Sequence, residues 1–138
     1  MRGRITHDPN PERAARGDFW GIALDSPDPR RLARFYVALL DWEIGSESDD
    51  WVTVRPPDGV AYLAFHVNDQ HVRPVWPSTP GEQQQQLHLD FEVQDLEAAV
   101  AHATELGAAP AEFQPQDDVR VMLDPDGHPF CLYLGSTE

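Results

Sequence analysis

The sequence predicts an α+β protein made of two paired βαβββ modules, with the helices outside and a cupped, barrel-like mixed sheet inside. The first observation behind this is a repeat. Residues 19–67 and residues 87–136 each run strand, helix, turn or short strand, and then two strands joined at Pro-Asp-Gly. The second observation is strand alternation that leaves one apolar face on each module. A module of about 50 residues cannot cover both faces of its own sheet, so we expect the two to pair.

The domain organisation follows from this repeat. Residues 1–18 show no sustained apolar period and are expected to form a flexible N-terminal arm. Residues 19–136 then form a single domain, with module one at about 19–67 and module two at 87–136. The intervening segment, 68–86, is rich in proline and glutamine and is expected to be a linker.

Each module carries one well-marked helix. In the first, Asp28 is the expected N-cap and Pro29 the first helical residue, and an apolar stripe runs along the helix from Leu32. In the second, Asp95 is the expected N-cap, and Gly107 is expected to end the helix. Both helices are therefore predicted to pack an apolar side on a sheet.

Strand alternation assigns the two faces of each predicted sheet. The apolar set is expected to face the helices: Ile22, Leu24, Val52, Val54, Leu63, Phe65, Val67, Leu89, Phe91, Val93, Val119, Val121, Leu123, Phe130, Leu132 and Leu134. The opposite set is the candidate lining of a ligand-binding cleft: Gly21, Ala23, Asp25, Tyr62, Ala64, His66, His88, Asp90, Glu92, Arg120, Met122, Cys131 and Tyr133. A solvated sheet face would explain the same polar residues, so both interpretations stay open.

Composition narrows the function classes. The formal charge is −14, and all ten basic residues are arginines. This charge disfavours nucleic acid and anionic lipid and mildly favours cationic ligands. Without lysine the chain can neither form a Schiff base nor supply a P-loop lysine. A single cysteine permits no internal disulfide, and no apolar run reaches membrane-spanning length, so we expect a cytoplasmic protein without a membrane anchor.

The sequence also resembles a known superfamily. The doubled βαβββ order, the DPDG motif before an apolar strand, and the stretch IALDSPDPRRLARFYVALLDW are similar to the vicinal oxygen chelate proteins, which include glyoxalase I, bleomycin-resistance proteins and extradiol dioxygenases. The resemblance covers residues 19–135. It implies a cleft that often binds a divalent metal, and a homodimer.

In metal-dependent relatives the ligands lie on the first and last strands of each module. When these positions are transferred to this sequence, the first is Gly21, which has no ligating side chain. The other three are His66, His88 and Cys131, and metal enzymes usually carry glutamate at the position of Cys131. His, His and thiolate can bind zinc, and nickel, manganese and iron are the other metals the resemblance suggests. Cys131 as a small buried hydrophobe is the alternative. We expect these three residues to face one cleft without holding a metal tightly.

Two further groups are candidates for the cleft. Asp90 and Glu92 share a strand face and could move a proton or bind a cation, although solvated carboxylates would look the same. Trp76 lies in the proline-rich linker and could line the cleft or an interface, or simply pack against the domain.

The sequence therefore favours a small-molecule binding protein of the glyoxalase/bleomycin-resistance type, with the ligand held in the cleft. The alternative is a metal-dependent lyase, isomerase or dioxygenase of the same superfamily, with Glu92 or Asp90 as the catalytic group. In both interpretations the partners are a small-molecule ligand and a second copy of the chain, and neither involves nucleic acid or a membrane.

Overall fold

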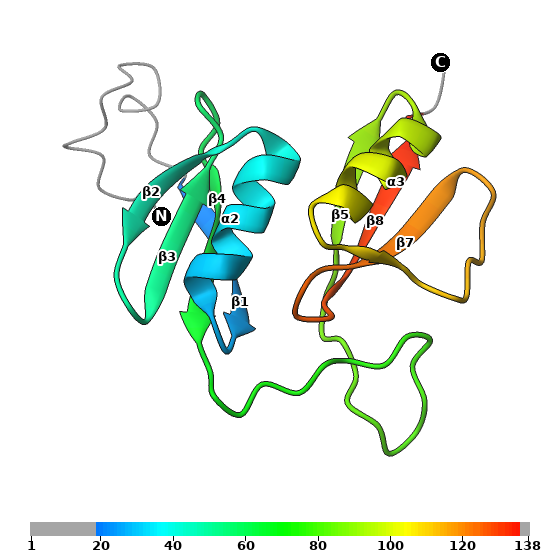
Figure 1. Ribbon diagram of the computed structural model, residues 1–138, viewed down its shortest axis with the longest axis horizontal. Coiled ribbons are helices and arrows are strands. Elements are labelled where there is room, and N and C mark those ends of the chain that lie inside the picture. The colour runs from blue at the N-terminus through cyan, green and yellow to red at the C-terminus, as the bar shows by residue number, and fades with distance from the viewer. Residues whose placement is uncertain (1–18, 136–138) are drawn as a thin grey trace. The chain divides into compact units, whose positions relative to one another are not determined.

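The computed structural model describes residues 19–135, which divide after His71 into two compact units. Each unit contains one helix and a four-stranded sheet (Figure 1). The α+β class and the doubled βαβββ order are confirmed. The predicted arm, residues 1–18, lies outside the described residues. Within the described range, no helix has the length and apolarity needed to cross a membrane.

The first unit has the element order β1 (Trp20–Ser26), α2 (Pro29–Leu40), β2 (Glu43–Glu47), β3 (Trp51–Arg55) and β4 (Ala61–Val67). The strands lie in the order β1-β4-β3-β2. β1 pairs with β4 in parallel, whereas β4, β3 and β2 pair antiparallel. The first strand therefore lies beside the last one.

The second unit repeats this topology. Its elements are β5 (Leu89–Val93), α3 (Leu96–Glu105), β6 (Ala109–Pro110), β7 (Val119–Leu123) and β8 (Pro129–Leu134). The strands lie in the order β5-β8-β7-β6, and β5 pairs with β8 in parallel. Residues on β5 and β8 that are 41 positions apart in the sequence, such as Asp90 and Cys131, are thereby direct neighbours.

The helix boundaries match the sequence signals. The Asp28 side chain accepts a hydrogen bond from the backbone N–H of Arg31 (3.1 Å), and Pro29 opens α2. The Asp95 side chain accepts one from the N–H of Ala98 (2.9 Å). Gly107 has a φ of 114°, a conformation that glycine adopts without strain, and the chain leaves α3 there.

The apolar faces form the cores beneath the helices. In the first unit Tyr36 of α2 is fully buried and its ring stacks on Phe65 of β4, with ring centroids 5.4 Å apart. In the second unit the rings of Phe91 and Phe130 meet edge to face at 6.1 Å. The other sheet face of each unit carries no helix of its own unit among the described residues, and we call it the open face (Figure 1).

Strand β7 corrects one prediction. Residues directly opposite in an antiparallel pair share a face, and Met122 pairs with Phe130 while Val121 pairs with Cys131. Arg120 and Met122 therefore lie on the core face, and Met122 is fully buried. The reverse was expected from the sequence, with Val119, Val121 and Leu123 facing the helix and Arg120 and Met122 on the opposite face. Alternation favoured the face without a charge, but the buried Met122 shares its face with Arg120, so period-2 alternation alone chose the wrong side.

The predicted linker makes specific contacts with the second unit. The Arg73 Nη1 donates a hydrogen bond to the carbonyl of Pro125 (2.7 Å). The Trp76 indole N–H donates to the carbonyl of Phe113 (3.1 Å), and the two rings are neighbours. In this unit Trp76 therefore packs against the loop that precedes β7.

Candidate functional site

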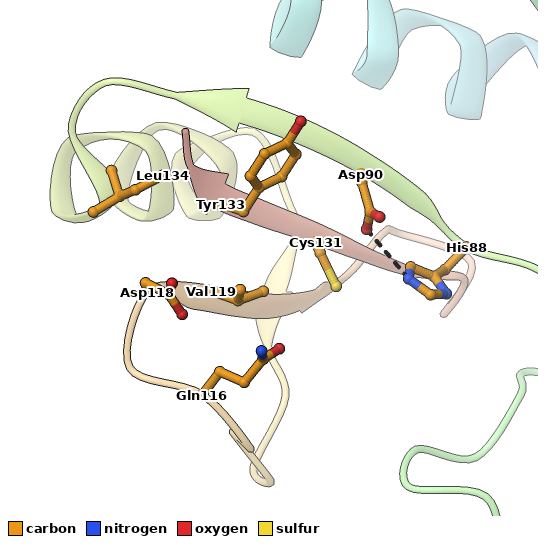
Figure 2. A pocket seen from close by; sticks show the side chains of 8 residues that line it. All are labelled: His88, Asp90, Gln116, Asp118, Val119, Cys131, Tyr133 and Leu134. Carbon is orange, nitrogen blue, oxygen red and sulfur yellow. Dashed lines mark ion pairs between the residues drawn. The ribbon is translucent and has the colours of Figure 1, made fainter. Parts of the chain in front are cut away.

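A pocket of about 250 Å³ lies on the open face of the second sheet, and we call it the second-unit pocket. β5 and β8 supply its centre because the parallel register sets Asp90 beside Cys131. Figure 2 shows the side chains that line it: His88, Asp90, Gln116, Asp118, Val119, Cys131, Tyr133 and Leu134. Every one of them belongs to the second unit.

His88 and Asp90 form an ion pair at one end of this pocket. The His88 Nε2 lies 3.2 Å from the Asp90 Oδ1, and both side chains are about half exposed (Figure 2). The two residues are two positions apart along an extended segment, so their side chains project to the same side. The carboxylate thereby holds the imidazole ring at the edge of the pocket.

Cys131 faces the same carboxylate from β8. The pKa of this thiol is raised from 9.0 to about 11, first by burial and then by the negative charge of Asp90 and a hydrogen bond to its carboxylate, which act in the same direction. The thiol is therefore protonated at neutral pH. In this state Cys131 is a poor nucleophile and donates a hydrogen bond to Asp90.

Several predicted site residues lie elsewhere. Glu92 is on the open face, but its carboxylate occupies the space beside Gly135, where a Cβ would lie 2.4 Å from Oε1. The Arg120 Nη1 donates to the backbone carbonyls of residues 116, 117 and 119 and so fastens the loop before β7. Tyr62 and His66 belong to the first unit.

The surroundings of His66 differ from those of His88. Its Nδ1 lies 3.9 Å from the Asp25 Oδ1, and its ring lies 5.8 Å from that of Trp51. The Asp25 Oδ2 also accepts a hydrogen bond from Asn68 Nδ2 (3.0 Å). His66 is therefore part of a separate polar group at one end of the first sheet.

The internal repeat gives the equivalent positions of the two units. Counted back from the helix N-caps, Asp28 and Asp95, residue 21 corresponds to His88 and residue 23 to Asp90. Residue 23 pairs with Ala64, as Asp90 pairs with Cys131. The equivalent of Cys131 is therefore Ala64, which is fully buried, rather than His66.

The pocket contains one possible metal-ligand set. Ligand atoms of His88, Asp90 and Cys131 all lie within 4.8 Å of one another. One nitrogen, one carboxylate oxygen and one sulfur suit a zinc ion with three protein ligands better than a hard octahedral cation, which prefers oxygen. To bind in this way, the ion would have to displace the thiol proton.

Sequence reasoning missed four residues that line the pocket, namely Gln116, Asp118, Val119 and Leu134. Gln116 and Asp118 lie in a loop without periodicity, so no pattern could place them. Val119 follows from the corrected face of β7. Only the proximity of Asp118 to the start of that strand could have suggested its position.

Known proteins share this architecture. A protein from Albidiferax ferrireducens T118, described as a glyoxalase/bleomycin resistance protein, is 21% identical with a TM-score of 0.59; the match covers 86% of this chain and 98% of that one. A glyoxalase family protein from Enterococcus faecalis is 25% identical with a TM-score of 0.58, over 83% and 94% of the two chains. TnmS3, an antibiotic binding protein from Streptomyces sp. CB03234, is 19% identical with a TM-score of 0.57, over 88% and 98%.

The family comparison agrees with the fold. A search of curated proteins finds no match. In contrast, the family model for the glyoxalase-like domain matches residues 21–133. This range includes every described helix and all but the ends of the first and last strands. The chain therefore belongs to the glyoxalase-like domain family, as its resemblance to the vicinal oxygen chelate superfamily predicted.

Proposed function

We propose that the chain binds a small cationic organic molecule in the second-unit pocket and holds it without changing it chemically. The observation that carries this proposal is the lining of that pocket, to which β5 contributes the carboxylate of Asp90, the loop before β7 that of Asp118, and β8 the ring of Tyr133 (Figure 2). Carboxylates pair with a cation, and an aromatic face adds a cation–π contact.

Two further facts support a binding role. The formal charge of −14 attracts cations to the whole surface. The protonated thiol of Cys131 offers no activated nucleophile beside the carboxylates. TnmS3, described as an antibiotic binding protein, shares this fold, so a binding role is compatible with the architecture.

Titration calorimetry with benzamidinium as the probe tests the proposal, with the neutral isostere benzamide as the matched ligand. We expect benzamidinium to bind and benzamide to bind at least tenfold more weakly. An Asp90→Asn variant should lose about 1–2 kcal/mol of binding free energy, because a half-exposed charge-assisted contact is worth about this much.

The control variant is Glu97→Gln, which removes one negative charge from exposed α3 outside the pocket. It should bind benzamidinium like the wild type. Equal losses in Glu97→Gln and Asp90→Asn would mean that only the overall charge attracts the probe, and would contradict a specific site.

The possible metal-ligand set of the second-unit pocket supports a second candidate function, a metal-dependent lyase, isomerase or dioxygenase. His88, Asp90 and Cys131 would hold the ion, which would polarise a substrate oxygen when bound. Asp90 would then be a ligand, and Glu92, the other carboxylate considered for proton transfer, lies beside Gly135 and outside the pocket lining. Stoichiometric metal in the purified protein that is lost in a His88→Ala variant would favour this function over metal-free binding.

We also propose that the chain is a cytoplasmic homodimer. Large apolar side chains such as Trp20 and Phe113 are at least half exposed in the single chain, and a partner could cover them. Light scattering at micromolar concentration should give twice the 15.5 kDa mass of one chain. A mass of one chain would reject the dimer.

A further inference from the structure

In the first unit the position equivalent to His88 is Gly21, and the aromatic ring of the neighbouring Tyr62 takes the space that a side chain would fill. Gly21 of β1 pairs with Tyr62 of β4, and a Cβ at residue 21 would lie 2.3 Å from the Tyr62 Cε2. Real Cβ atoms do not approach other atoms so closely. The glycine therefore allows the Tyr62 ring to lie flat over the bare backbone of β1.

A β-bulge opens the neighbouring part of the same face. The register of β2 against β3 shifts between Ile44 and Ser46, which leaves Gly45 as the extra residue. A Cβ at residue 45 would lie 2.7 Å from the Thr53 Oγ1. This oxygen accepts a hydrogen bond from the Ser46 N–H (2.9 Å) and lies 2.9 Å from the Ser46 Oγ. The bulge therefore leaves a pair of hydroxyl groups without a covering side chain from residue 45.

These features border a second pocket of about 250 Å³, which we call the first-unit pocket. Phe19, Val60 and Tyr62 give it apolar walls, and among the described residues that line it Arg55 is the one ionised side chain. The Arg55 Nε donates to the Glu43 Oε1 (3.0 Å), and this contact holds the guanidinium at the rim. No carboxylate is among the described residues that line this pocket.

We propose that the first-unit pocket binds a planar aromatic molecule that carries a carboxylate. The aromatic ring packs on Tyr62 and Phe19, and the carboxylate accepts a hydrogen bond from the one O–H group that the contact between Ser46 and Thr53 leaves available, near the positive charge of Arg55. The proposal does not rest on the cation site above. The two pockets have no described lining residue in common, and the second-unit pocket is lined by carboxylates whereas the first-unit pocket is lined by Arg55.

Titration with 2-naphthoate, followed by tyrosine and tryptophan fluorescence and by amide chemical shifts, tests this site. The wild type should bind 2-naphthoate and shift the amides of β1, β2 and β4. Naphthalen-2-ylmethylammonium, which has the same ring and the opposite charge, should bind at least tenfold more weakly at these residues. Equal or tighter binding of the cation there would overturn the proposal, as would the absence of naphthoate binding.

Two variants locate the contact. In Gly21→Ala the added methyl group displaces the Tyr62 ring, and affinity for 2-naphthoate should fall at least tenfold. If this variant does not fold, as judged by circular dichroism, Thr53→Val supplies the test through the loss of one hydroxyl group and an affinity reduced at least threefold. Unchanged affinity in a folded variant would overturn the proposal.

The matched control is Asp90→Asn in the second-unit pocket. It should leave 2-naphthoate affinity unchanged while it weakens benzamidinium binding. Loss of 2-naphthoate binding in Asp90→Asn would overturn the proposal, whereas loss of benzamidinium binding in Gly21→Ala would count against the separate cation site.

Discussion

Replacing Asp124 with alanine is expected to lower the free energy of unfolding by about 3–5 kcal/mol, because several buried hydrogen-bond donors lose their acceptor. The side chain of Asp124 is fully buried between β7 and β8. Its Oδ1 accepts hydrogen bonds from the backbone N–H groups of Asp126 (2.9 Å) and His128 (3.0 Å). Its Oδ2 lies 2.8 Å from the His128 Nδ1.

The expected loss of unfolding free energy is large because Asp124→Ala leaves buried hydrogen-bond donors without an acceptor. Alanine removes the acceptor of two backbone N–H groups and leaves the imidazole of His128 facing a cavity. Each unsatisfied buried donor costs about 1–3 kcal/mol. The same turn positions Cys131 four residues after Gly127, so its loss should also disturb the second-unit pocket.

Urea unfolding measures this effect. The matched variant is Asp124→Asn, which keeps one acceptor oxygen for the backbone N–H groups and loses the carboxylate oxygen that contacts His128, so its loss of unfolding free energy should be intermediate. A loss below about 1 kcal/mol in Asp124→Ala, within the range of ordinary surface substitutions, would contradict the role assigned to this carboxylate.

An Asp90→Asn substitution should make Cys131 react about tenfold faster with iodoacetamide at pH 8. The pKa of the wild-type thiol is about 11, so only about one thiol in a thousand is ionised at that pH. Asparagine removes the charge that raises this pKa and weakens the hydrogen bond, whereas burial remains. The pKa should therefore fall, and each unit of decrease multiplies the thiolate fraction about tenfold.

Because the pKa of the Cys131 thiol is raised, the pH dependence of its alkylation rate can also be predicted. In the wild type the alkylation rate should rise about tenfold per pH unit between pH 8 and pH 10, and it should level off only above the raised pKa. Because the chain has one cysteine, the whole signal reports on Cys131. Asp118→Asn is the control, since Asp118 lines the pocket without contributing to the shift. Equal acceleration in both variants would contradict a specific Asp90–Cys131 contact.

The sequence predicted the fold well because its signals are local. Asp28, Asp95 and Gly107 mark helix ends through their own backbone chemistry, and the two Pro-Asp-Gly turns mark where the strands reverse. The prediction for the faces of β7 was wrong for a physical reason. Val121 and Met122 are both apolar and both buried, and only the pairing with β8 decides which of them shares the core face with Phe130.

The candidate site was predictable only in part. Asp90 and Cys131 follow from alternation along two strands, and their contact follows from the parallel pairing of β5 with β8. The assignment of His66 as the equivalent of Cys131 depended on a turn of uncertain length, and the ladder places Ala64 there. Gln116 and Asp118 come from an irregular loop, whose path depends on contacts such as those of Arg120 with its carbonyls.

The most direct test of the proposed function is a benzamidinium titration of protein dialysed against a chelator, followed through the backbone amide chemical shifts. The account predicts saturable binding without added metal, with the largest shifts at Asp90, Cys131 and Tyr133 and in the loop that carries Asp118. Binding that appears only after zinc is restored would contradict metal-free binding, and shifts that avoid β5 and β8 would contradict the site.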